Sequence, residues 1–214
     1  MYPAVMKAVQ LPRHGDLDAL VYSEYVPQPE PGADEVLIEV TACGMNNTDV
    51  WVRQGAYGTE TDPDSVSTWR RGRSTLTFPR IQGTDIVGRI AAVGPGVSEE
   101  RLGERVMVDF SLYNRDDDSL ADIDYIGHGR DGGYAEYTVV PAENAHAVAT
   151  DLADAELATF CCAYLTGEHM LARAAVLGAR FDLAELAAIA GASPADVLGQ
   201  LQPALNQGYV RPLD

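Results

Sequence analysis

The sequence predicts a mainly β fold that is followed by a small helical C-terminal part. Short apolar and β-branched segments recur over residues 6–150, namely at 6–9, 36–40, 86–93, 105–109 and 134–140. Proline and glycine separate them, as at Pro29, Pro31 and Gly32. Several short strands at this spacing are typical of a barrel-like or sandwich-like sheet. From Asp151 onward the composition shifts to Ala, Leu and Glu, which favours helix.

Turn residues support the individual strands. The segment 86–93 ends at Gly94-Pro95-Gly96, a tight turn in which we expect positive φ at the glycines. We expect Gly83 and Gly88 to permit close approach of neighbouring backbones. The polar stretches 58–77 and 111–131 are predicted to be loops.

The C-terminal residues carry helix signals. We expect a connecting helix over 151–173, capped by Asp154, after the β domain of residues 1–150. Within a helical tail over 174–214, an acid follows Asp182 by three residues, and Ser193-Pro194 resembles a second helix start. The first of these helices should end at Gly191 and the second at Gly208, before a short extended segment at 209–210.

Composition limits the classes of function. The formal charge of −17, from 32 acids against 15 bases, disfavours nucleic acid as a partner. No apolar run approaches the roughly 20 residues that span a bilayer, and residues 1–9 do not resemble a signal peptide. Three cysteines, Cys43, Cys161 and Cys162, make a poor disulfide framework. We therefore expect a cytoplasmic protein without a membrane partner.

Five stretches in order carry a family resemblance. They lie at 42–49, 53–57, 78–88, 93–106 and 132–137, the last running on to 162–166. Residues from about 6 to 172 resemble the GroES-like catalytic domain of the medium-chain dehydrogenase/reductases, in the zinc-independent, quinone-oxidoreductase-like branch. The resemblance implies a partly open β-barrel and NADP(H)-linked reduction of a ketone, quinone or enone.

The resemblance also implies that no catalytic zinc is bound. Zinc-dependent members use a Cys, a His and a second Cys, and those positions fall here on Asn46, Thr84-Asp85 and Cys162. A catalytic zinc needs three protein ligands, typically nitrogen or sulfur, and the four-cysteine cluster for structural zinc is absent. Cys43, three residues early, is expected to be a small buried residue rather than a substitute ligand. Cys161 and Cys162 are expected to pack on a helix rather than to perform redox chemistry.

Without zinc, hydrogen bonds must polarise the substrate. By resemblance, Asn47, Thr48 and Tyr57 line the cleft beside the nicotinamide, and Thr166 lies at the domain junction. We assign catalysis to these first three residues and cofactor contacts to Asn47, Thr48 and Thr166. Tyr57 is the candidate proton donor, or else a loop aromatic that packs on the barrel. The single histidines His128, His146 and His169 are expected to be satisfied surface or helix residues.

The expected nucleotide-binding domain is not evident. Its fingerprint is a strand, a glycine-rich turn and a helix, whereas the nearest candidate, 190–194, follows a helix and contains Pro194. Residues 174–214 instead resemble the winged-helix-like segment after the ATPase core of large bacterial signalling ATPases. With only Arg180 and Arg211 as basic residues, this tail lacks a phosphate-binding footprint. We expect a packing module and no NADPH binding by this chain alone.

Three hypotheses of function remain open. The first is an oxidoreductase that needs a partner chain for its cofactor. The second is a non-catalytic interaction module, in which Leu157, Phe160 and Leu165 of the helix 155–173 form an exposed patch. The tail helices would cover this patch or pair two chains into a homo-oligomer. The third is a relic of a gene fusion without selected activity.

Overall fold

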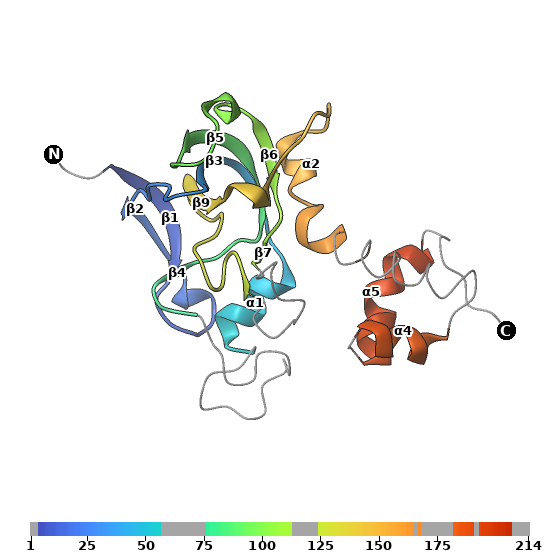
Figure 1. Ribbon diagram of the computed structural model, residues 1–214. Helices are drawn as coiled ribbons and strands as arrows, with labels where there is room; N and C mark the ends of the chain where they lie inside the picture. The colour runs from blue at the N-terminus through green and yellow to red at the C-terminus, as the bar shows by residue number, and fades with distance from the viewer. Residues whose placement is uncertain are drawn as a thin grey trace. The chain divides into compact units, whose positions relative to one another are not determined.

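The structure is a computed structural model that describes residues 4–56, 76–112, 124–164, 167, 182–190 and 193–206 (Figure 1). The chain divides into two compact units, residues 1–162 and 163–214. The first unit is mainly β, as predicted, and the described elements of the second are helices. No helix in the described part of the chain is long and apolar enough to cross a membrane.

Ten strands are described in the first unit. They are β1 (Val5–Leu11), β2 (Val21–Pro27), β3 (Glu35–Gly44), β4 (Arg80–Ile81), β5 (Asp85–Val93), β6 (Arg105–Val108), β7 (Ser111–Leu112), β8 (Asp124–Tyr125), β9 (Tyr137–Pro141) and β10 (Ala145–Ala147). Their sheets have the orders β2-β1-β4, β10-β6-β5-β3-β9 and β7-β8, and all pairs are antiparallel. The five strands predicted from sequence all form, whereas β2, β4 and β10 lack a comparable sequence signal.

The helices are short. The α-helices with described bounds are α1 (Asn47–Gln54), α2 (Asp154–Leu157), α4 (Leu183–Ala190) and α5 (Pro194–Asn206). Short 3-10 helices lie at Leu17–Ala19, Glu99–Arg101 and Ala142–Asn144. α1 directly follows β3, and α2 lies beside the five-stranded sheet, where it contacts β3 and β5 (Figure 1). The sheet thus positions both helices of the first unit.

Alternating side chains of the five-stranded sheet form the main core. The inward positions of neighbouring strands hold β-branched residues that are almost fully buried: Val36, Ile38, Ile86, Ile90, Val106, Val108 and Val140. Each such side chain contributes roughly 1.5–3 kcal/mol on burial. The register of β3 on β5 shifts between Val40 and Ala42, which marks a bulge just before the chain enters α1.

Three of the glycines singled out in the sequence, Gly88, Gly94 and Gly96, can be compared with the backbone. A Cβ at Gly88 would lie 2.2 Å from the Glu39 carbonyl oxygen, so the predicted close approach is confirmed. Gly96 has φ +93°, as expected for the turn after β5. Gly94 differs from expectation, because the described positive φ values do not include it; a Cβ there would instead meet the Gly32 carbonyl oxygen at 1.7 Å.

The two predicted loops and the connecting helix need correction where the structure describes them. Within 111–131, β7 pairs with β8, so that part of the loop prediction is wrong; residues 57–75 and 113–123 lie outside the described residues. The helix expected over 151–173 begins as the four-residue α2 and turns at 158–160, and residues 161–164 are helical again. Its N-cap is Ala153 rather than the predicted Asp154, which is the first helical residue and whose carboxylate accepts from Arg105 Nε at 2.7 Å.

In the second unit, α4 and α5 begin where the capping signals predicted. The Asp182 carboxylate accepts from Ala184 N at 2.7 Å, and Ser193 Oγ accepts from Asp196 N at 3.2 Å. The two helices pack together and bury apolar side chains: Leu186, Ala187, Val197 and Leu201. Residues 191–192 and 207–214, which include the predicted helix stops and the extended segment, lie outside the described residues.

Candidate functional site

The candidate site begins where β3 ends and α1 starts. Asn46 is the N-cap of α1: its Oδ1 accepts from Thr48 N at 3.5 Å, and its own backbone N donates to Asp49 Oδ2 at 2.9 Å. This capping box places Asn47 and Thr48 in the first turn, where the backbone N–H groups of a helix carry partial positive charge. Asn47 is exposed and Thr48 is half-buried.

Asp49 anchors this helix start to the rest of the unit. Its buried carboxylate also accepts from Gly83 N at 3.1 Å and from the Tyr134 hydroxyl at 2.9 Å, and its backbone carbonyl accepts from Gln82 Nε2 at 2.8 Å. Burial raises the pKa of Asp49 and outweighs the hydrogen bonds, which lower it. Burial, and next the charge of Asp49, raise the pKa of Tyr134 well above its usual range.

A second carboxylate, Asp85, lies at the start of β5 and is 2% exposed. It accepts from the Thr84 hydroxyl at 3.2 Å, from Asn46 Nδ2 at 3.5 Å and from Cys162 N at 2.5 Å. Burial raises the pKa of Asp85, while the hydrogen bonds from Cys162, Thr84 and Asn46 lower it. The segments before α1, at β5 and after α2 therefore meet at one carboxylate.

The three thiols around these carboxylates are poorly ionisable. Burial, then the charges of Asp49 and Asp85, raise the pKa of Cys43 well above its usual range. Burial, then the charge of Asp85, raises the pKa of Cys161 to about 12 and that of Cys162 to about 11. The Cys162 thiol is also hydrogen-bonded to Thr48 and Thr84. A thiolate is the form that binds metal or acts as a nucleophile, so these thiols are not activated.

The predicted packing roles of two cysteines agree with the structure. Cys43 is partly rather than fully buried and packs against the main core, and Cys161 is buried with its Sγ 3.9 Å from the Ile86 carbonyl oxygen. None of the three cysteines, all of which the structure describes, forms a disulfide.

The residues at the zinc-ligand positions do converge in space. Asn46, Thr84 and Cys162 are all bonded to Asp85, although they are up to 116 positions apart in the sequence (162 − 46). An amide, an alcohol and a protonated thiol are not the donor set of a catalytic zinc. In the described part of the chain, no group of three or more His, Cys, Asp or Glu side chains is arranged to hold a metal ion. The residues present therefore do not fit a catalytic zinc.

The structure describes only some of the site residues that the sequence predicted. The structure brings Thr48 to Cys162 and sets Asn47 beside it on α1. Tyr57 and Thr166 lie outside the described residues, as does His169. The sequence reasoning assigned no role to Asp49, Asp85 and Tyr134; only Asp49 carried a local signal, as the acid three residues after an N-cap.

The histidine expectation is wrong for His128. Its ring is buried in the turn after β8, where Nδ1 lies 3.1 Å from Asp124 Oδ1 and the ring stacks against Tyr125 at 5.1 Å. The ring is thus a satisfied interior group rather than a surface one. His146 is exposed on β10, as expected.

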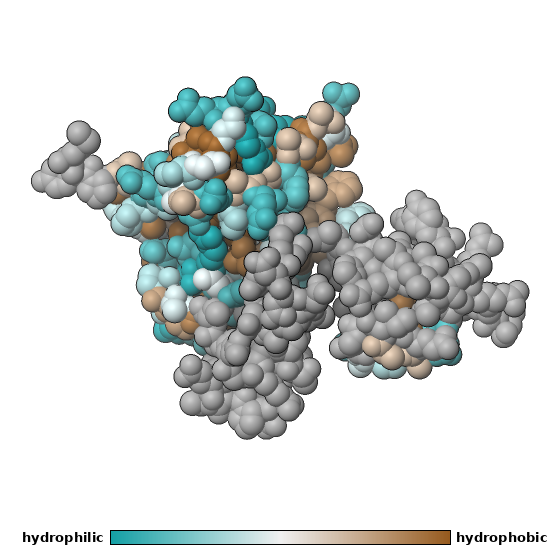
Figure 2. Space-filling view, viewed as in Figure 1, coloured by the Kyte–Doolittle hydropathy of each residue, from teal (hydrophilic) through white to brown (hydrophobic). Residues whose placement is uncertain are grey.

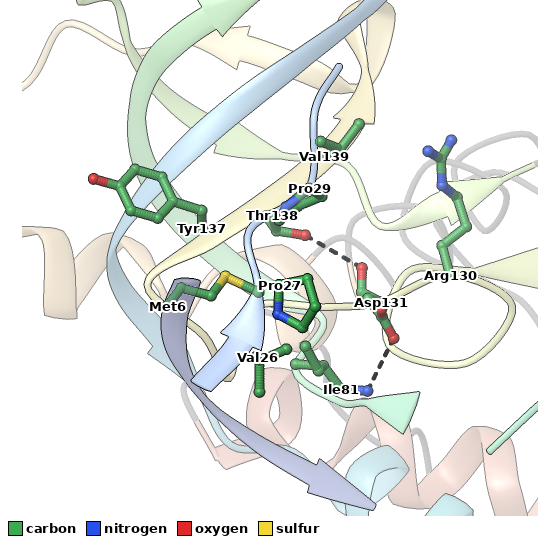
Figure 3. A pocket seen from close by; sticks show the side chains of 10 residues that line it. All are labelled: Met6, Val26, Pro27, Pro29, Ile81, Arg130, Asp131, Tyr137, Thr138 and Val139. Atoms are coloured by element: carbon green, nitrogen blue, oxygen red, sulfur yellow. Dashed lines mark hydrogen bonds between the residues drawn. The ribbon is translucent and has the colours of Figure 1, made fainter. Parts of the chain in front are cut away.

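A separate pocket of about 290 Å³ lies between β1, β2, β4 and β9 (Figure 3). Apolar side chains from Met6, Val26 and Ile81 line the pocket together with Arg130 and Asp131, and Asp131 lies next to Ile81. The charged groups are already engaged: Arg130 pairs with Glu35 at 2.5 Å, and Asp131 accepts from Arg80 and from Ile81 N. This pocket shares no lining residue with the cluster around Asp49 and Asp85.

Comparison with known proteins identifies relatives of the same kind. A family model described as the alcohol dehydrogenase GroES-like domain matches residues 32–150. A probable alcohol dehydrogenase, AdhA, of Mycobacterium tuberculosis is 30% identical over 79% of this chain and 49% of its own. A quinone oxidoreductase of Lama guanicoe is 30% identical over 63% of this chain and 31% of its own.

Solved structures agree. A crystal structure provisionally described as an alcohol dehydrogenase from Sinorhizobium meliloti 1021 is 76% identical, with a TM-score of 0.74 over 80% of this chain and 48% of that one. An alcohol dehydrogenase, RspB, from E. coli CFT073 in complex with NADH is 25% identical, with a TM-score of 0.62 over 79% of this chain and 46% of that one.

The chain spans about half the length of AdhA and of both solved structures, and less of the quinone oxidoreductase. The family model covers more than half of the chain's 214 residues. It includes all of the five-stranded sheet, from β3 to β10, as well as α1 and Asp85. The chain therefore belongs to the alcohol dehydrogenase GroES-like domain family of the medium-chain dehydrogenase/reductases.

Proposed function

We propose that this chain supplies the catalytic domain of a zinc-independent, NAD(P)H-linked oxidoreductase that reduces a ketone, quinone or enone. The observation that carries the proposal is the chemistry at the zinc-ligand positions, where Asn46, Thr84 and Cys162 surround a carboxylate instead of a metal. The relatives named as alcohol dehydrogenase and quinone oxidoreductase, and the NADH complex of RspB, support the reaction class and the cofactor.

The chain's own residues would orient and polarise the substrate. In this proposal the Thr48 hydroxyl and the Asn47 amide, in the first turn of α1, donate to the substrate oxygen, where negative charge develops. Asn47, Thr48 and Thr166 would also contact the cofactor, and Tyr57 would donate the proton. The reduced nicotinamide supplies the hydride when it is bound.

The described residues do not fit the nucleotide itself. After Cys162 the described elements are helical, and among them no strand leads through a glycine-rich turn into a helix. We therefore propose that a nucleotide-binding domain beyond the described residues, or on a partner chain, holds NADPH. The helices α4 and α5 would be a winged-helix-like packing module, and three cysteines outside any disulfide are in keeping with a cytoplasmic location.

A chimera tests this function. Residues 1–162 would replace the matching part of the 76% identical Sinorhizobium meliloti protein, whose remaining half is kept. We expect the 214-residue chain alone to show no saturable NADPH binding by nicotinamide fluorescence. We expect the chimera to oxidise NADPH with one or more compounds of a panel of ketones, quinones and enones, and to stay active after chelator treatment.

Variants of the chimera locate the chemistry. Thr48→Val should lower kcat by about 10- to 1000-fold, because it removes a donor to the developing charge, whereas Thr48→Ser should retain most activity. Loss of activity on chelation would overturn zinc independence. Turnover by the 214-residue chain alone would overturn the need for an added nucleotide domain.

An interaction module is the second candidate, and one observation favours it. Leu152 and Phe160 flank α2 and are 40% and 37% exposed, and Figure 2 shows apolar patches on the surface of the first unit. The patch is smaller than the sequence suggested, since Leu157 is 5% exposed and packs on Val87; Leu165 lies outside the described residues. Sedimentation of the chain and of Phe160→Ser would test self-association, and a monomer in both cases argues against pairing.

A further inference from the structure

Three side-chain or backbone donors point at the Asp85 carboxylate, and they come from the three residues at the zinc-ligand positions. The Thr84 hydroxyl and Asn46 Nδ2 donate to Oδ2, and Cys162 N donates to Oδ1. A catalytic zinc presents the opposite arrangement, in which lone pairs converge on a cation. Here N–H and O–H groups converge on an anion, which is an acceptor when ionised.

The burial of Asp85 makes these partners necessary. A carboxylate withdrawn from water is costly unless it is hydrogen-bonded, and bonds to an ionised acceptor are stronger than neutral ones. The donors come from separate segments: the loop before α1, the residue before β5, and the helical turn after α2. A single carboxylate thereby joins segments that a metal joins in zinc-dependent relatives.

The identity of residue 46 follows from this arrangement. Oδ1 of Asn46 caps α1 by accepting from Thr48 N, while its Nδ2 donates to Asp85. Aspartate or serine could provide the cap, but an ionised aspartate cannot donate. Asparagine has both an acceptor and a donor at the end of one short side chain, so it links the carboxylate to the helix that carries Asn47 and Thr48.

We infer that Asp85 is a positioning residue that replaces the metal as the centre of this site, by holding the α1 N-cap and the segment at Cys162 in register. The inference rests on the proposed function only for the identification of the site as a catalytic one. The hydrogen bonds themselves lie within the first unit.

Amide hydrogen exchange in the full chain tests the hydrogen bond from Cys162 N to Asp85. We expect Asp85→Asn to speed exchange of the Cys162 amide about tenfold, measured by NMR, because the amide loses a charged acceptor. Asp16→Asn is the matched control, since Asp16 is exposed and makes no side-chain cap hydrogen bond; it should leave the Cys162 amide unchanged. Equal exchange in wild type and Asp85→Asn would overturn the inference.

A swap of the two side chains separates positioning from simple loss of stability. Asn46→Asp keeps the cap but sets two carboxylates against each other, and Asp85→Asn replaces the charged acceptor with a neutral amide. In the combined variant, Asn at 85 can donate to Asp at 46. We expect its folding equilibrium constant, measured by urea unfolding, to exceed the value expected from the two single variants by about fivefold or more. Additive effects would overturn the direct pairing of residues 46 and 85.

A milder pair covers the case in which Asp85→Asn does not fold. Thr84→Val removes the hydroxyl and keeps the shape, while Thr84→Ser keeps the hydroxyl. We expect about threefold faster exchange of the Cys162 amide in the valine variant than in the serine variant, and equal rates would overturn the inference. These measurements do not use NADPH, so a chimera without reductase activity would contradict the proposed function and leave this result standing.

Discussion

The Tyr134 hydroxyl donates a 2.9 Å hydrogen bond to Asp49 Oδ2, across 85 residues of sequence. It thereby connects the segment before β9 to the capping box of α1, where Asn47 and Thr48 lie. The hydroxyl also lies 3.4 Å from the Gly44 carbonyl oxygen, at the end of β3. The geometry of the helix start thus depends on a residue that is remote in sequence.

Tyr134→Phe should destabilise the protein by about 1–3 kcal/mol, because it leaves a buried carboxylate with one donor fewer. Urea unfolding of wild type and variant measures the difference. Tyr22→Phe is the matched control: it removes a hydroxyl that bonds Glu24 at 3.0 Å on the exposed edge strand β2. No measurable change in the free energy of unfolding is expected there, and equal effects for the two tyrosines would contradict the role of Tyr134.

The Asp49 carboxyl should make stability depend on pH. Burial raises the pKa of Asp49 in the folded state, so folding favours its protonated form. Its contribution is fully present below the unfolded pKa of about 3.9 and is lost as the pH rises through the raised folded pKa. The stability of wild type relative to Asp49→Asn should therefore be greatest near the unfolded value and decrease toward neutral pH. Urea unfolding across this range checks the sign, and a constant difference would contradict it.

Cys162 should be a slow nucleophile. With its pKa raised from 9.0 to about 11, the thiolate fraction at pH 8 is about a hundredfold lower than that of an unperturbed thiol. Alkylation rates by mass spectrometry, with fragmentation to separate Cys161 from Cys162, measure this. Asp85→Asn should speed alkylation of Cys162, since the charge of Asp85 is the second cause of the raised pKa after burial. Rapid alkylation of Cys162 in the folded wild type would contradict this prediction.

Two substitutions should introduce a metal. Asn46→Cys combined with Thr84→His would complete a Cys-His-Cys set with Cys162 at positions that already converge on Asp85. We expect one zinc per chain in the purified double variant by elemental analysis. The two single variants, with two ligands each, should retain less than the double variant. A folded double variant without zinc would show that these positions do not converge closely enough.

The second unit should depend on the contact between α4 and α5. Leu186 in α4 is fully buried, so Leu186→Ala should cost about 2–5 kcal/mol and reduce the helix content measured by circular dichroism. Leu198 in α5 is 45% exposed, and Leu198→Ala should change stability little. If both variants lose the same helix content, the described packing of α4 on α5 is wrong.

Local patterns sufficed for much of the fold. The apolar β-branched runs predicted β1, β3, β5, β6 and β9, since short runs of such residues between turn residues favour strands. The cap residues Asp182 and Ser193 predicted the starts of α4 and α5, because a cap bonds to the backbone two or three residues away. The order of the motifs was also enough to indicate the family, which the match over residues 32–150 confirms.

Through the family resemblance, the sequence by itself indicated which residues stand at the zinc-ligand positions, because motif positions are read along the chain. Only the tertiary structure decided what those residues do together. Tyr134 meets Asp49 across 85 positions, and Cys162 meets Asp85 across 77. Such contacts depend on strand register, on the bulge before α1 and on the burial of both partners, and these are collective properties of the packed sheet. A carboxylate can therefore be the centre of a site without any sign of it in its neighbouring residues.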